Sequence, residues 1–174
     1  QAEDVIRDRD VTGVQTCALP IFRYQIIGEH TDAKYFAELQ ETIRKNHLEK
    51  RVIFREGVSD EELTETYRRA KAFILTSISD GPHFEGFGLV YLEANASGLP
   101  VIGSSGSGAE DAIRDGITGF LVPQNDPPET AKVAAQLLSD SELWRAMSEE
   151  SQIWAKMHDW SKVVKAYVKI YKLS

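Results

Sequence analysis

Two carboxylates and two glycines lie close together in the segment FEGFGLVYLEANASG, residues 84–98. Glu85 and Glu93 have seven residues between them, and Gly86 and Gly88 flank Phe87. A helix that begins near Gly88 has first N–H groups without intrahelical acceptors, and such an end binds phosphate or diphosphate. Glu93 could hold the vicinal hydroxyls of a ribose, and Glu85 the hydroxyls of a sugar. Together these groups suit a nucleotide sugar. The plainer alternative is that the carboxylates only complement a helix dipole and the glycines only form a turn.

The elements that must position this segment alternate between strand and helix. The apolar run Ala72–Thr76 is typical of a strand covered on both faces, and Gly98 and Pro100 end the helix that follows it. Ser59 and Glu62 form a capping box at the start of an earlier helix. This alternation predicts an α/β fold with an open parallel sheet, helices on both faces and a C-terminal helical extension. The expected strands are 23–28, 51–54, 72–76, 100–103 and 119–122, and the expected helices 32–47, 59–70, 88–97, 109–114 and 160–171.

The expected terminal helix carries one apolar stripe. Its members recur at helical spacing and are Trp160, Val163, Val164, Tyr167, Val168 and Tyr171. We expect this stripe to pack on the body of the domain, and a partner-binding surface is the alternative.

Composition excludes several classes of protein. The 174 residues carry a formal net charge of −7, which disfavours a nucleic-acid partner because an acidic surface repels phosphate backbones. The single Cys17 excludes an intrachain disulfide, and the four histidines offer no zinc spacing. No apolar run approaches the roughly 20 residues that a membrane span needs.

The first residues have an unusual pattern of their own. Residues 11–21, VTGVQTCALPI, resemble a translated sequencing adapter, and residues 1–8, QAEDVIRD, resemble the preceding adapter block. We therefore expect residues 1–21 to be non-native and residues 22–174 to be the natural domain, incomplete at its N-terminus. A natural N-terminal strand and turn is the alternative. Because Cys17 lies in this segment, no argument about thiol chemistry rests on it.

A wider set of motifs resembles the donor-binding half of the retaining glycosyltransferases of family four, which are GT-B enzymes built from two Rossmann-like domains. The resemblance runs from about residue 22 to residue 172. The matching residues are Val58–Leu63, Glu85–Leu89, Glu93-Ala94, Gly98–Ile102, Gly106, Gly108, Glu110, Gly116, Thr118-Gly119, Trp160, Tyr167 and Tyr171. The turn Gly106-x-Gly108-x-Glu110 is only half of a dinucleotide fingerprint, and we expect it to be structural.

The resemblance implies roles for particular residues. Glu85, the catalytic candidate, matches the family's first Glu, which contacts hydroxyls of the transferred sugar, and Glu93 matches the Glu that holds the ribose. The loop around Arg55 and Gly57 matches a segment near the nucleobase. The donor-binding segment, whose backbone N–H groups meet the sugar and diphosphate, comprises Gly86, Phe87, Gly88, Leu89 and Val90.

The resemblance also implies a reaction. It is transfer of a sugar, with retained configuration, from a UDP-, GDP- or ADP-linked donor to a glycan, lipid or small-molecule acceptor, without a cofactor or metal. A cytoplasmic enzyme is implied, with peripheral association at the inner face of the membrane as a variant. A GT-B-like phosphorylase, a nucleotide-sugar epimerase and a non-catalytic nucleotide-binding module are alternatives.

Two parts of the family's pattern are not recognisable in this sequence. One is an Arg and Lys pair that neutralises the leaving diphosphate, and the other is the N-terminal acceptor domain. We therefore expect the 174-residue chain to be catalytically silent.

Overall fold

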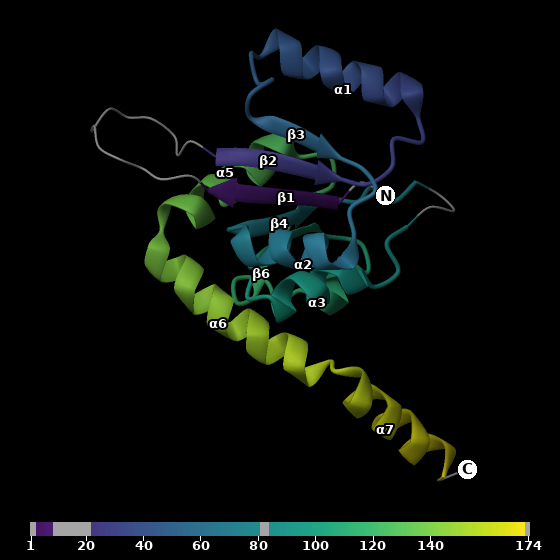
Figure 1. The fold of residues 1–174 in the computed structure, drawn as a ribbon. Coiled ribbons are helices and arrows are strands. Elements are labelled where there is room, and N and C mark those ends of the chain that lie inside the picture. Colours follow the sequence, from purple (N-terminus) through teal and green to yellow (C-terminus); the bar gives the residue numbers. More distant parts are fainter. Residues whose placement is uncertain (1–2, 9–21, 81–83, 173–174) are drawn as a thin grey trace.

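The computed structural model describes residues 3–8, 22–80 and 84–172. These residues form a six-stranded sheet with helices on both faces, which confirms the α/β fold (Figure 1). Cys17 lies outside the described residues. The strands are β1 (Glu3–Asp8), β2 (Phe22–Ile27), β3 (Val52–Arg55), β4 (Ala72–Leu75), β5 (Val101–Ser104) and β6 (Gly119–Val122). The helices are α1 (Ala33–Lys45), α2 (Asp60–Arg69), α3 (Leu89–Ala96), α4 (Ala109–Ala112), α5 (Pro127–Ser139), α6 (Ser141–Met157) and α7 (Trp160–Tyr171).

The sheet contains the five expected strands and one further strand, β1, that runs in the opposite direction. The strand order is β3-β2-β1-β4-β5-β6. β2 pairs parallel with β3, and β4, β5 and β6 are parallel to one another, but β1 is antiparallel to both of its neighbours. The five expected strands, β2 to β6, therefore all run in the same direction, which confirms the predicted parallel sheet. β1 is an additional strand in the segment suspected of being non-native, and the origin of that segment stays a prediction. Its direction could not be predicted, because either direction can pair the backbone of a central strand.

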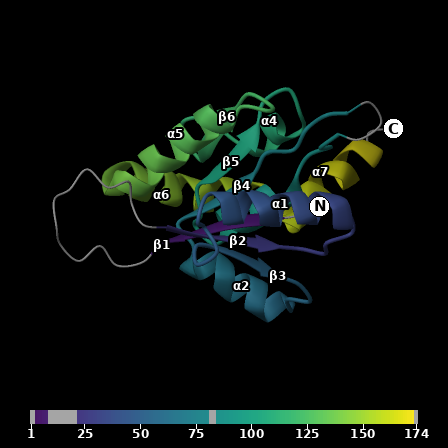
Figure 2. The same cartoon turned by 90° about the horizontal axis from the view of Figure 1, so that it is seen from above.

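The helices divide between the two faces of the sheet. α2, α3 and α4 pack around a core that contains Phe73, Tyr91 and Leu99, all buried. α5 packs on the other face against Ile74 and Ile102. Figure 2 shows α2 and α5 on opposite sides of the sheet. All four residues of β4 are buried, which confirms the prediction of a strand covered on both faces.

The caps form as the sequence predicts. Ser59 Oγ accepts from the Glu62 N–H at 3.2 Å, and Glu62 Oε2 accepts from the Ser59 N–H at 3.0 Å. This capping box fixes where α2 begins. Gly98, with a φ of 78°, follows the last turn of α3 and lets the chain turn into β5.

α6 and α7 form the C-terminal extension, and only α6 packs closely on the domain. Trp154 Nε1 donates to the Ala112 carbonyl at 2.7 Å, and Trp144 Nε1 donates to the Lys71 carbonyl at 2.6 Å. α7 instead extends away from the sheet (Figure 1), and Tyr171 is 76 % exposed. The expectation that the α7 stripe packs on the body of the domain was wrong, because amphipathicity shows that a face is apolar without showing what covers it. Within the described ranges, no helix is long and apolar enough to cross a membrane.

Candidate donor-binding site

The loop before α3 is locked against the loop after β5. The Gly108 N–H donates to the Glu85 carbonyl at 2.8 Å. A Cβ on Gly108 would lie 2.1 Å from the Gly86 carbonyl oxygen, so only glycine allows this approach. Glu110 Oε1 accepts from the Gly106 N–H at 2.6 Å, which occupies a donor that a phosphate would need. These contacts favour the structural interpretation of the Gly106–Glu110 turn.

Gly88 sets the start of α3. Its φ is 73° and its ψ is 63°, a left-handed conformation, and it caps the helix without a side-chain hydrogen bond. A Cβ at this position would lie 2.4 Å from two ring atoms of Tyr91. The first turn of α3 contains no acidic residue. The N-terminus of α3 therefore has the backbone donors and positive dipole end that suit an anion.

Glu85 is half-buried and faces the carboxyl end of β4. Ser77 Oγ donates to Glu85 Oε2 at 3.3 Å. Tyr91 lies close by, and its hydroxyl donates to the Leu75 carbonyl at 2.6 Å. Burial, and then the negative charge of Glu85, raise the pKa of the Tyr91 hydroxyl well above its ordinary value. Glu85 is thus held at the edge where the chain leaves β4, next to the start of α3.

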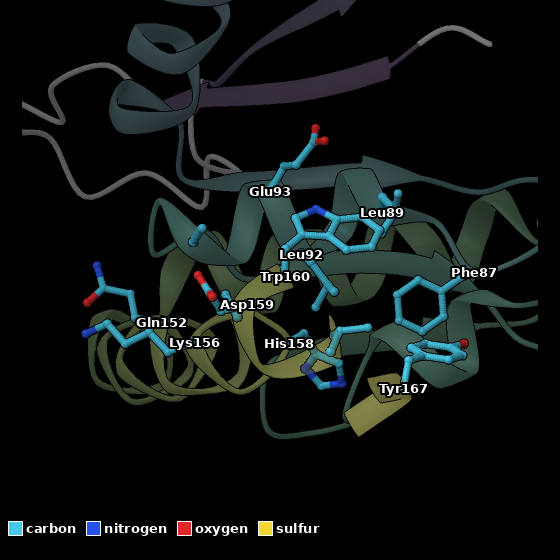
Figure 3. A pocket seen from close by; sticks show the side chains of 13 residues that line it. Phe87, Leu89, Leu92, Glu93, Gln152, Lys156, His158, Asp159, Trp160 and Tyr167 are labelled. Carbon is cyan, nitrogen blue, oxygen red and sulfur yellow. The ribbon is translucent and has the colours of Figure 1, made fainter. Parts of the chain in front are cut away.

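Glu93 lies within α3 and on a different surface of the domain from Glu85. With Phe87 and Leu89, it lines a cavity of about 710 Å³ between α3, the end of α6 and α7. In Figure 3 the Glu93 carboxylate points to the rim of this cavity, away from the rings of Phe87 and Tyr167. Glu93 is exposed and lies in the second turn of α3, so the helix dipole alone does not account for it.

The structure therefore brings together only part of the expected donor site. Phe87, Leu89 and Glu93 share the large cavity, whereas Glu85 and Val90 are not among its lining residues. Val90 packs on the core that contains Tyr91. The roles assigned to these residues stay predictions.

α7 supplies cavity residues that the sequence did not assign to a site. They are Trp160, Val163 and Tyr167. His158, which also lines the cavity, has its ring centroid 4.2 Å from that of Trp154. The helical spacing of the α7 stripe was the available signal, but spacing alone does not reveal that α3 lies opposite.

Arg55 is held by α2. Its guanidinium donates to Thr66 Oγ1 at 3.1 Å and lies 3.4 Å from Glu62 Oε1. The Arg55 side chain therefore packs against α2 and not against the loop that follows β3. Gly57, in that loop, is exposed. A nucleobase role would therefore fall to the loop's backbone and to the residues around it.

His30 joins this loop to the one after β2. The His30 N–H donates to Glu56 Oε1 at 3.0 Å, and His30 Nδ1 contacts the same oxygen. These hydrogen bonds lower the pKa of the Glu56 carboxyl. The His30 ring packs against Phe36 and Phe54, with centroids 4.0 and 5.2 Å away. Sequence reasoning missed this pair because its members are 26 residues apart.

Among the described residues, no cluster of three or more His, Cys, Asp or Glu side chains is placed to hold a metal ion. The candidate site consists instead of backbone donors at the start of α3, two carboxylates and the adjoining cavity.

This arrangement, on an α/β sheet with glycine-rich loops at its carboxyl edge, is that of a domain from a GT-B glycosyltransferase. Residues 17–154 match the family model of the glycosyl transferases group 1, and the chain belongs to that family. The match covers the sheet from β2 onward, all of α3 and most of α6.

Curated relatives are similar over part of their length. A D-inositol 3-phosphate glycosyltransferase of Streptomyces scabiei is 35 % identical over 120 residues, which cover 69 % of this chain and 26 % of that protein. An uncharacterized glycosyltransferase of Methanocaldococcus jannaschii is 26 % identical over 151 residues, 87 % of this chain and 40 % of that protein. The chain thus spans about a quarter of the length of the Streptomyces relative.

Solved structures share the fold. Anabaena HepE, in complex with UDP-glucose, superposes with a TM-score of 0.69 at 23 % identity, covering 86 % of this chain and 39 % of that one. The C-terminal domain of a group 1 glycosyl transferase, LpcC of Francisella tularensis, gives a TM-score of 0.61 at 29 % identity. The superposition covers 74 % of this chain and 64 % of that one.

Proposed function

We propose that this chain is the donor-binding part of a glycosyltransferase and that the start of α3 receives the diphosphate of a nucleotide sugar. The observation that carries the proposal is the left-handed Gly88, which begins α3 without a side-chain cap and with no carboxylate in the first turn. The N–H groups of Leu89 and Val90 lie in this first turn. An anion placed there gains backbone hydrogen bonds and the favourable end of the helix dipole.

In the proposed reaction, the N–H groups at the start of α3 stabilise the leaving group. Negative charge builds on the departing diphosphate, and preorganised N–H groups stabilise that charge more in the transition state than in the ground state. Glu85, fixed by Ser77 beside the start of α3, would hold hydroxyls of the transferred sugar. Glu93, in the second turn, would accept from the ribose hydroxyls. The sugar is transferred with retained configuration.

The donor class is supported by the family and by a structural neighbour. The relatives are named glycosyltransferases, and the Anabaena structure holds UDP-glucose. UDP is therefore the first nucleotide to test, followed by GDP and ADP. The acceptor, a glycan, lipid or small molecule, would meet the donor in the complete enzyme, for which we propose a cytoplasmic location that cell fractionation tests.

The test is a calorimetric titration of the purified chain with UDP, GDP and ADP. We expect all binding to be weak, with one of the three nucleotides binding more tightly than the other two. Glu93→Gln should reduce the affinity for that nucleotide. Loss of a hydrogen bond from a charged acceptor costs about 1.5–3 kcal/mol, which is about 10- to 150-fold in affinity. Glu149→Gln, an exposed carboxylate on α6, is the matched control and should leave binding unchanged.

Two results would contradict the proposal. Equal affinity of the wild-type chain and Glu93→Gln would remove the ribose role. Sugar transfer catalysed by the 174-residue chain alone would refute our expectation that it is silent.

A further inference from the structure

Three loops leave the sheet at the carboxyl ends of β4, β5 and β6. These strands are parallel neighbours, so their carboxyl ends lie at one edge of the sheet. Ser79 belongs to the loop after β4, Ser105 and Gly106 belong to the loop after β5, and Gln124 belongs to the loop after β6. Glu85 lies further along the first of these loops, before α3. The contacts that join the three loops therefore bear on the position of Glu85.

The Gln124 side chain joins all three loops. Its Oε1 accepts from the Ser79 N–H at 2.9 Å. Its Nε2 donates to the Ser105 carbonyl at 3.0 Å and to the Gly106 carbonyl at 3.2 Å. A primary amide offers an acceptor and two donors together, which neither a carboxylate nor an aliphatic chain of the same length supplies. Gln124 is half-buried, so these contacts are partly shielded from water.

The backbone around Gln124 is fixed on both sides. Before it, the carbonyl of Val122, the last residue of β6, accepts from the Ser105 N–H at 2.8 Å. After it, Asn125 has a φ of 55°, a left-handed conformation that asparagine tolerates better than most residues with a Cβ. Asp126 then caps α5 through its side chain. Gln124 thus reaches the other two loops from a well-defined backbone.

The loop after β5 also holds Glu85. The Gly108 N–H donates to the Glu85 carbonyl at 2.8 Å, and Ser77 Oγ donates to the Glu85 carboxylate at 3.3 Å. Ser77 precedes Ser79 by two residues, so Gln124 holds the chain close to the donor of that carboxylate. The loop after β5 therefore anchors Glu85 twice, directly at its carbonyl and indirectly, through Gln124, at its carboxylate.

We propose that Gln124 is a positioning residue for the Glu85 carboxylate. By holding Ser79, it fixes where the chain leaves β4 and therefore where the Ser77 hydroxyl meets Glu85. The inference deepens the proposed function and rests on it in one respect, which is that Glu85 faces the donor sugar. Sequence reasoning assigned no role to Gln124, because Gln124 and Ser79 are 45 residues apart and no local spacing relates them.

The test is NMR spectroscopy of the purified, isotope-labelled chain, and it needs no ligand. Gln124→Glu keeps the shape of the side chain and an acceptor for the Ser79 N–H, but it places an oxygen where Nε2 faces two carbonyls. Gln124→Met keeps the length of the side chain without its hydrogen bonds. Gln40→Glu, at an exposed position of α1, is the matched control for the change of charge.

Two signals are measured. They are the exchange rate of the Ser79 amide proton and the carboxyl carbon resonance of Glu85, which Glu85→Gln assigns. We expect the Ser79 amide to be protected in the unmodified chain and to exchange about tenfold faster in both Gln124 variants. The Glu85 resonance should move in both variants in the same direction as in Ser77→Ala, because each change weakens the hydrogen bond from Ser77. Gln40→Glu should alter neither signal.

Two results at these positions would overturn the proposal. If the Ser79 amide exchanges freely in the unmodified chain, its hydrogen bond to Gln124 is absent. If exchange at Ser79 becomes faster while the Glu85 resonance stays unchanged, Gln124 stabilises its own loops without positioning the carboxylate.

A third amide separates a local effect from unfolding. Ile102 lies in the centre of β5, between β4 and β6, and its amide should keep its protection in every variant. Loss of that protection in both Gln124 variants also overturns the proposal, because Gln124 then holds the whole sheet and not Glu85 in particular. Since no signal depends on a nucleotide, a chain that binds no UDP, GDP or ADP would contradict the proposed function and leave this test decisive.

Discussion

The strictest test of the α3 start is the substitution Gly88→Ala. Gly88 has a φ of 73°, and a Cβ there would lie 2.4 Å from two ring atoms of Tyr91. Tyr91 is fully buried and its hydroxyl is bonded to the Leu75 carbonyl, so the ring has little freedom to move away. Alanine at this position therefore requires both a left-handed backbone and a shift in the core.

The expected cost follows from these two terms. A left-handed conformation costs a residue with a Cβ about 1–2 kcal/mol, and overpacking a closed core costs about 1–3 kcal/mol. Together they give a loss of about 2–5 kcal/mol in the free energy of unfolding, which is a large part of the stability of a small domain. If the substitution unwinds the first turn instead, the N–H groups of Leu89 and Val90 lose their arrangement and nucleotide binding falls.

The assay is urea denaturation followed by circular dichroism, together with the nucleotide titration. Gly86→Ala is the control in the same loop, because Gly86 has open space around its Cβ position and is not among the glycines with positive φ. That variant should differ from wild type by less than about 0.5 kcal/mol. A Gly88→Ala variant as stable as Gly86→Ala would show that the start of α3 is not fixed by this glycine.

Other predictions concern the buried contacts around the site. Because the pKa of Tyr91 is raised above 10, unfolding releases its proton at high pH, so the stability it contributes is full below pH 10 and falls as the pH rises further. Tyr91→Phe should remove this loss of stability in urea denaturation measured between neutral pH and pH 11, and an unchanged pH profile would contradict the raised pKa of Tyr91. At neutral pH the same substitution should lower the free energy of unfolding by about 1–3 kcal/mol, because the Leu75 carbonyl loses its hydrogen-bond donor. Trp154→Phe removes the hydrogen bond to the Ala112 carbonyl and should lower the thermal midpoint through a loss of about 1 kcal/mol; a midpoint equal to that of wild type would contradict this. Ser59→Ala removes the cap of α2 and should cost about 1 kcal/mol in the same melts, with no effect on nucleotide affinity.

The sequence located the elements because their signals are local. The capping box at Ser59 and the apolar run of β4 each depend on a few neighbouring residues, and both are present in the structure. Gly98 ends α3 through a backbone conformation that glycine allows and other residues resist. Such features can be read from one segment at a time.

The relations between segments could not be read in this way. The same stripe pattern that describes a packed helix also describes α7, which leaves Trp160 68 % exposed and uses part of its surface to line a cavity. Glu85 and Glu93 are only eight positions apart in the sequence, yet Glu85 faces Ser77 while Glu93 lies at the rim of that cavity. The helical turn between them rotates the second carboxylate to another surface.

The sequence by itself determined the α/β class and the family resemblance, and it predicted a donor-binding segment, because each is carried by residue types at fixed local spacing. Only the tertiary structure decided the direction of β1, the pairing of His30 with Glu56 and the cavity between α3, α6 and α7. The physical reason is that strand pairing and packing join residues far apart in the chain. Their outcome depends on which surfaces meet, and no single segment encodes that.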